Sequence, residues 1–133
     1  MRRTRLVLGF VAGAMLLLSA GAHSILGWKN LSGQLAAAQA PADLTQALAI
    51  GWQFSGIAML GFGLTVILTF LRFRKDEGAS LAPVMVIALI YLVFGAWALV
   101  ATRFDPFFSI FIVPGLMLLA ASWRKTTDPI WDV

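Results

Sequence analysis

The chain has 133 residues, of which 60% are hydrophobic and only 12% are charged. A soluble protein of this size carries about 25% charged residues, so a surface this poor in charge indicates a chain that lipid covers. The net charge of +4 does not indicate nucleic-acid binding, because the basic residues form short clusters between apolar runs. The absence of cysteine excludes disulfides, thiolate metal sites and thiol catalysis.

Four apolar runs follow one another along the chain, each long enough to cross a bilayer as a helix. A crossing takes about 20 helical residues, and closed barrels are excluded because their strands alternate in polarity. The sequence therefore predicts an all-α membrane protein of one domain (residues 1–133), a four-transmembrane-helix bundle. The runs cover residues 6–28, 45–71, 81–101 and 106–123, and none contains Asp, Glu, Lys or Arg.

The basic residues are distributed unevenly between the two sides of these runs. Positive charge accumulates on the cytoplasmic side of membrane proteins, so the side with the larger number marks the cytoplasm. Both termini are predicted to be cytoplasmic, as in a multi-pass protein of a plasma membrane. One side carries Arg2, Arg3, Arg5, Arg72, Arg74, Lys75, Arg124 and Lys125, and the other carries only Lys29 and Arg103.

The first run has a second interpretation. Residues 1–22 also resemble a secretory signal peptide, with a basic start and a small-residue site at Ala20-Gly21-Ala22. The apolar character continues beyond that site through His23 to Trp28, which completes the length of a full span. We therefore expect an uncleaved first helix.

Cap residues mark the predicted helix ends. Asp43 with Gln46 three positions later matches a capping box at the start of the second run. Asp105 directly before a proline is typical of an N-cap, and Ser80 is suited to cap the third run. Between the first two runs, residues 29–42 contain apolar residues at helical spacing, which predicts a short helix lying at the membrane interface.

One polar cluster is expected inside the bundle. His23 shares its helical face with small residues, which mark the side where neighbouring helices approach. The second run places Trp52 and Gln53 at a similar depth, and the third run places Trp97 there. The predicted ligand-binding set is His23, Gln53, Trp52, Trp97, Ser19 and Arg103, with Ser55 near enough in depth to contribute.

Three roles are open for this cluster. His23 can form a structural hydrogen bond between helices, or help to hold a lipophilic ligand such as a quinone, a lipid or a pigment. It can also act as a general base, which would require an orienting acid such as Asp43 or Asp105. A zinc site needs three or four ligands, and one histidine without cysteine does not supply them, so no metal or cofactor is required.

Short glycine-based motifs carry a resemblance. The run Gly21-Ala22-His23-Ser24-Ile25-Leu26-Gly27-Trp28, then Ile50-Gly51-Trp52 and Met59-Leu60-Gly61-Phe62-Gly63, resembles small bacterial membrane proteins that share a four-helix layout with the DoxX-like group. The resemblance implies a four-helix bundle in a bacterial inner membrane and implies no reaction. The cysteine motifs of some DoxX-like proteins are missing here.

These observations favour a non-enzymatic protein. The leading hypothesis is an accessory or structural subunit of a membrane complex, or a binder of a lipophilic ligand, with membrane lipid and other membrane subunits or further copies of itself as partners. The first alternative is an oligomeric transporter or channel component, against which the lack of an embedded charged residue counts. The second is a membrane enzyme acting on lipid or quinone through His23.

Overall fold

The computed structural model describes residues 2–123, and within this range all regular structure is helical. Three helical segments are long and apolar enough to cross a membrane, and a shorter apolar segment follows them. The all-helical prediction is confirmed, and each predicted apolar run falls on one helical segment. The elements are α1 (Arg2–Ala22), the π-helix η1 (His23–Gly27), α2 (Trp28–Ala37), α3 (Ala42–Lys75), α4 (Ala82–Ala101), the 3-10 turn η2 (Pro106–Phe108) and α5 (Ser109–Ser122).

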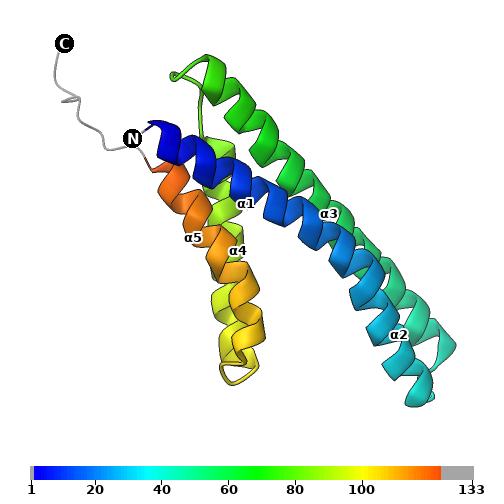
Figure 1. The fold of residues 1–133 in the computed structure, drawn as a ribbon. Coiled ribbons are helices and arrows are strands. Elements are labelled where there is room, and N and C mark those ends of the chain that lie inside the picture. The colour runs from blue at the N-terminus through cyan, green and yellow to red at the C-terminus, as the bar shows by residue number, and fades with distance from the viewer. Residues whose placement is uncertain (1, 124–133) are drawn as a thin grey trace, which may run out of the picture.

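The first three elements form one continuous helical segment of 36 residues. Helical backbone angles persist at Trp28, where η1 passes into α2, and α2 extends the axis of α1 (Figure 1). A separate helix lying at the membrane interface was predicted in residues 29–42. That prediction is wrong in its orientation, because the helix in this region continues along the axis of α1. The chain reverses only at residues 38–41, where Gln39 takes a φ of 52° and the last carbonyls of α2 accept bonds from Gln39 and Ala40.

The start of α3 also differs from its prediction. The helix begins at Ala42, so Asp43 lies in its first turn and is not the N-cap. Pro41 occupies the N-cap position, and no side chain caps the helix there. The carboxylate of Asp43 still lies where the helix dipole favours negative charge.

The other two cap predictions hold in part or in full. The Asp105 side chain accepts a hydrogen bond from the Phe107 N–H at 2.9 Å, as the N-cap of the 3-10 turn that leads into α5. The Ser80 Oγ accepts from the Ala82 N–H at 3.3 Å, although the helix assigns its N-cap position to the following leucine. Short polar side chains therefore lie at the start of α4 and at the start of the turn that leads into α5.

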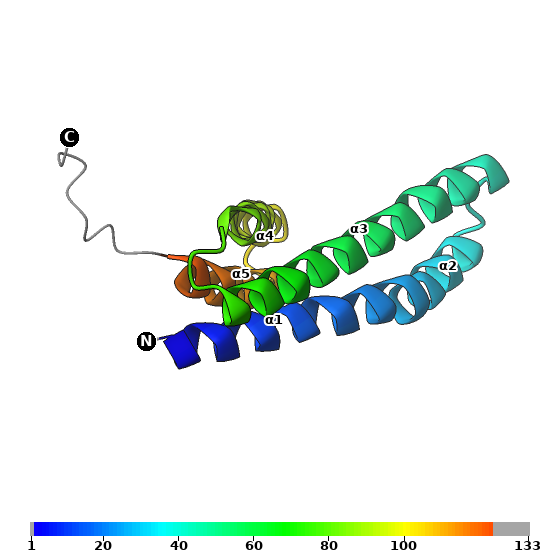
Figure 2. The ribbon, with the colours of Figure 1, turned by 90° about the horizontal axis from the view of Figure 1, so that it is seen from above.

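The helices form two hairpins. α1 packs along α3 in the first, and α4 packs along α5 in the second. Contact between the hairpins is made chiefly by α1 against α5, and α3 touches α4 much less. Figures 1 and 2 show the hairpins meeting near the N-terminus and diverging toward the opposite end, where α2 and the start of α3 stand apart from α4 and α5.

The buried core lies where the hairpins meet. Its α3 members are all in the C-terminal third of that helix, and η1 and α2 contribute no buried residue. The outer ends of the hairpins are consequently held by pairwise contacts and not by a shared core. The core residues are Ala12, Leu16, Val66, Phe70, Phe73, Leu81, Val84, Ile87, Ala88, Tyr91, Leu118 and Ala121.

Two arginines of α1 join the three chain segments at this end. The Arg5 guanidinium donates to the Ala121 carbonyl at 2.8 Å, and its carbon lies 5.1 Å from the centroid of the Phe73 ring. A cation at the last carbonyls of α5 also offsets the partial negative charge of that helix end. Arg2 forms a 2.8 Å ion pair with Glu77 in the α3–α4 turn. The N-terminus, the α3–α4 turn and the end of α5 therefore lie together, while Arg124 and Lys125 lie outside the described residues.

Close packing of α1 on α3 depends on a glycine. A Cβ at Gly63 would lie 2.7 Å from a methyl of Leu17 and 3.1 Å from the Leu17 backbone nitrogen. Backbone does not move aside as a flexible side chain does, so this position tolerates no larger residue without separating the helices. Gly61, two residues earlier on α3, has no atom within 4 Å of such a Cβ.

We expect Gly63→Ala to lower the free energy of unfolding by roughly 1–3 kcal/mol, because the added methyl overpacks the α1–α3 contact. Gly61→Ala is the matched control and should leave stability unchanged or slightly higher, since alanine is the better helix former. Thermal or denaturant unfolding in detergent, followed by circular dichroism, measures both. Equal effects of the two substitutions would show that α1 and α3 are not in close contact at Gly63.

Candidate functional site

The predicted polar cluster forms at the π-helix. The ring of His23 stacks on that of Trp52 with a centroid separation of 4.3 Å and an angle of 6° between the planes. His23 is the first residue of η1 and Trp52 lies on α3, so the stack joins the two helices of the first hairpin. Both side chains are half-buried.

The wider turn of η1 directs backbone carbonyls toward α3. In η1 the Trp28 N–H donates to the His23 carbonyl, five residues back, instead of following the α-helical spacing of four. Trp52 Nε1 donates to the same His23 carbonyl at 2.8 Å, and Gln53 Nε2 donates to the Ser24 carbonyl at 3.1 Å. Two side chains of α3 therefore supply donors to the carbonyls of η1.

This arrangement requires the backbones to be close, and Gly56 permits it. A Cβ built at Gly56 would overlap the Ser24 hydroxyl, and Gly56 is buried. Gly56 lies one helical turn after Trp52 and Gln53, so the close approach positions their side chains against η1.

The hydrogen-bond network also assigns the proton on His23. The Ser55 hydroxyl has one hydrogen and donates it to the Trp52 carbonyl at 2.7 Å. Nε2 of His23 lies 2.8 Å from the Ser55 Oγ and 3.3 Å from the Trp52 carbonyl oxygen. A proton on Nε2 lets that atom donate to both oxygens, so the network favours the Nε2–H tautomer.

The structure brings together some predicted site residues and separates others. His23, Trp52, Gln53 and Ser55 lie in one cluster, as their expected depths indicated. Ser19 lies one helical turn before His23 on α1 and is half-buried. The π-helix packs against α1, α2 and α3 alone within the described chain. The remaining two predicted residues, Trp97 and Arg103, belong to the second hairpin, on α4 and in the turn after it.

The cluster is better suited to holding helices than to acid–base chemistry. A histidine base needs a neighbouring acid to orient it. Asp43 lies 12 residues before Ser55 on α3, about 18 Å along the helix at 1.5 Å per residue. The Asp105 side chain is engaged as an N-cap on the other hairpin. Trp52, Gln53 and Ser55 each donate one hydrogen bond to a backbone carbonyl.

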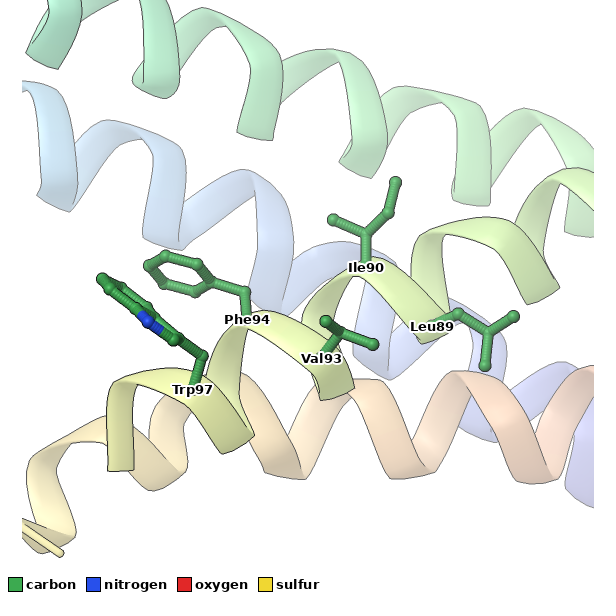
Figure 3. Close-up of a pocket in the computed structure, with 5 residues that line it drawn as sticks. All are labelled: Leu89, Ile90, Val93, Phe94 and Trp97. Carbon is green, nitrogen blue, oxygen red and sulfur yellow. The ribbon is translucent and has the colours of Figure 1, made fainter. Parts of the chain in front are cut away.

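A second candidate site is an apolar groove on the outer face of α4. It offers about 480 Å³ of space, and its lining is almost wholly apolar. The rings of Phe94 and Trp97 lie 5.6 Å apart at one end of it, and Trp97 is 64% exposed. Figure 3 shows five side chains projecting from successive turns of α4; the residues of the groove are Leu89, Ile90, Val93, Phe94 and Trp97.

The sequence predicted Trp97 at the depth of His23 and gave no indication of this groove. The spacing of Ile90, Phe94 and Trp97, at four and then three residues, marks one helical face. Nearly every position of that run is apolar, so periodicity alone does not show which face α3 and α5 leave uncovered. The uncovered face follows from the divergence of the hairpins.

Comparison with known proteins found no matching family model, no matching curated protein and no matching solved structure. The likeness to the DoxX-like group thus stays a resemblance in layout. Function must be argued from the two sites themselves.

We expect Trp52→Phe to lower the free energy of unfolding by about 1 kcal/mol, because the ring stack is kept while the donor to the His23 carbonyl is lost. Trp97→Phe is the matched control, since that indole is exposed and its loss should leave stability unchanged. Unfolding in detergent measures both variants. Unchanged stability of Trp52→Phe would contradict a bracing role for the indole.

Proposed function

We propose that this chain is a non-catalytic, multi-pass protein of a bacterial inner membrane that binds a lipophilic ligand in the groove on α4. Three described segments have the length and apolarity of membrane-crossing helices, which supports the membrane assignment. The observation that carries the binding role is the groove, an apolar hollow with an aromatic platform on a helix face that no other helix covers.

Four crossings follow if the segment of residues 106–122 is included. That segment is shorter than a typical span, at 17 residues. It returns antiparallel to α4, and its end meets Arg5 of α1. The segment pairs with α4, which is long enough to span, and it ends at the level where α1 starts. It should therefore cover the same depth of membrane, and we count it as the fourth crossing.

The charge distribution supports cytoplasmic termini. Six cationic residues gather at the end where α1 begins and α3 stops, and the ion pair of Arg2 with Glu77 holds two of these segments together. At the opposite end the described chain carries only Lys29 and Arg103. Because positive charge accumulates on the cytoplasmic side of membrane proteins, this distribution supports a cytoplasmic location for this end.

The lining of the groove favours a lipophilic small molecule. Sites for such molecules are mostly apolar, and the five residues of this open groove on α4 are all apolar. The tilted pair of Phe94 and Trp97 offers ring faces for a flat or branched apolar group. In the polar cluster at His23, the indole N–H of Trp52 and one amide N–H of Gln53 are engaged in holding η1 against α3.

The absence of cysteine allows a direct test of topology. In intact cells, a membrane-impermeant maleimide should label Gly33→Cys in α2, because that position lies at the predicted outer end and is exposed. It should label Ser80→Cys in the α3–α4 turn only after the membrane is permeabilised. The reverse pattern would contradict cytoplasmic termini, and labelling of both positions from outside would contradict the crossing of α3.

We expect a lipid or quinone to co-purify in near-equal molar amount when the full chain is extracted in mild detergent, and organic extraction with mass spectrometry to identify it. Val93→Trp should lose that molecule, because the indole fills the groove. Leu18→Trp, at an exposed position of α1 outside the groove, is the matched control and should retain it. If Val93→Trp instead releases a stoichiometric membrane protein, the groove is a subunit interface and the role is that of an accessory subunit.

A further inference from the structure

A buried hydroxyl on α4 has no hydrogen-bond partner. Tyr91 is only 6% exposed, and within the described residues its Oη is the single buried side-chain polar atom left without a partner. Burying a hydroxyl without a partner costs free energy, and most buried tyrosines therefore find one. An exception of this kind calls for a functional or structural reason.

The ring of Tyr91 is connected to the groove through aromatic contacts. It lies 6.1 Å from the ring of Phe111 on α5, which in turn meets the edge of Phe94 at 4.9 Å. Phe94 lines the groove beside Trp97 (Figure 3). On its other side Tyr91 meets Phe62 of α3 at 6.3 Å. The unpaired hydroxyl thus lies in the seam between α3, α4 and α5, two ring contacts from the groove.

We propose that the Tyr91 hydroxyl is the hydrogen-bond donor to a carbonyl oxygen of the lipophilic ligand, an inference that rests on the proposed binding role of the groove. The ligand class is an apolar molecule that carries a carbonyl group, supplied by a quinone ring or by an acyl ester. A phenol donates readily to such an oxygen, and in apolar surroundings the bond is strong.

Access to the hydroxyl requires a side chain to move. Phe94 is 44% exposed, so its ring has room to turn toward the lipid side of α4. The carbonyl end of the ligand then occupies the space that Phe94 vacates, and its apolar remainder stays in the groove.

This role predicts opposite effects of one substitution on stability and on binding. Tyr91→Phe removes the unpaired hydroxyl, so the ligand-free protein should melt roughly 3–5 °C higher in detergent. The same variant should bind a carbonyl-bearing ligand about 5–10-fold more weakly, because one hydrogen bond is lost. A hydroxyl with a purely structural partner would instead make Tyr91→Phe less stable.

The binding test uses three probes on the full chain in lipid nanodiscs. A decyl-substituted benzoquinone quenches tryptophan emission, and Trp97→Phe identifies the part of the signal that comes from the groove. Methyl laurate and decylbenzene are then titrated as competitors, the first with an ester carbonyl and the second with none. Tyr91→Phe should weaken binding of the quinone and leave competition by decylbenzene unchanged. If competition by the ester is weakened as well, the hydroxyl takes any carbonyl group as its partner. If only quinone binding is weakened, the carbonyl is that of a quinone ring.

Two results separate the failure of this inference from the failure of the proposed function. If the wild-type chain binds all three probes and Tyr91→Phe alters none of them, the groove binds apolar molecules but Tyr91 takes no part. A lower melting temperature for Tyr91→Phe would equally overturn the inference. If the wild-type chain binds no probe and Val93→Trp behaves identically, the groove is not a ligand site.

Discussion

The contact between η1 and α3 is the constraint on which the outer half of this structure depends. The π-helix turns its carbonyls toward α3, where Trp52 and Gln53 donate to them. Gly56 lets the two backbones come close enough for those bonds to form. Without this brace, α2 and the first half of α3 have few buried contacts to hold them together.

The same pairing explains the shape of the molecule. α1 packs along α3, and α4 packs along α5, so the most extensive helix contacts lie within each hairpin and not between the two. The hairpins share a core only near the cytoplasmic end of the proposed orientation, where Arg5 links α1 to the end of α5. One face of α4 stays exposed, while Tyr91 on the same helix belongs to the shared core.

Much of the fold was predictable because apolar run length and charge placement are local properties of the chain. The helical segments and the cap at Asp105 follow from them, as does the meeting of His23 with Trp52 and Gln53, which lie at matching depths on consecutive antiparallel helices. Depth does not distinguish between neighbours around a bundle, and so it did not show that Trp97 lies on the hairpin that the π-helix does not contact. The continuous helix through residues 29–37 was missed because apolar residues at helical spacing suit an interfacial helix as well as an extension of α1.

By itself the sequence determined that the chain is helical, that its apolar segments suit a bilayer and that its cations gather at one end, since length, composition and charge require no knowledge of neighbours. Only the tertiary structure decided which faces those helices bury. It decided that Trp52 and Gln53 donate to carbonyls of the π-helix, that the face of Phe94 and Trp97 is open, and that the Tyr91 hydroxyl is buried without a partner among the described residues. In helices that are apolar on every side, periodicity carries little information about contacts, and packing geometry alone selects the site.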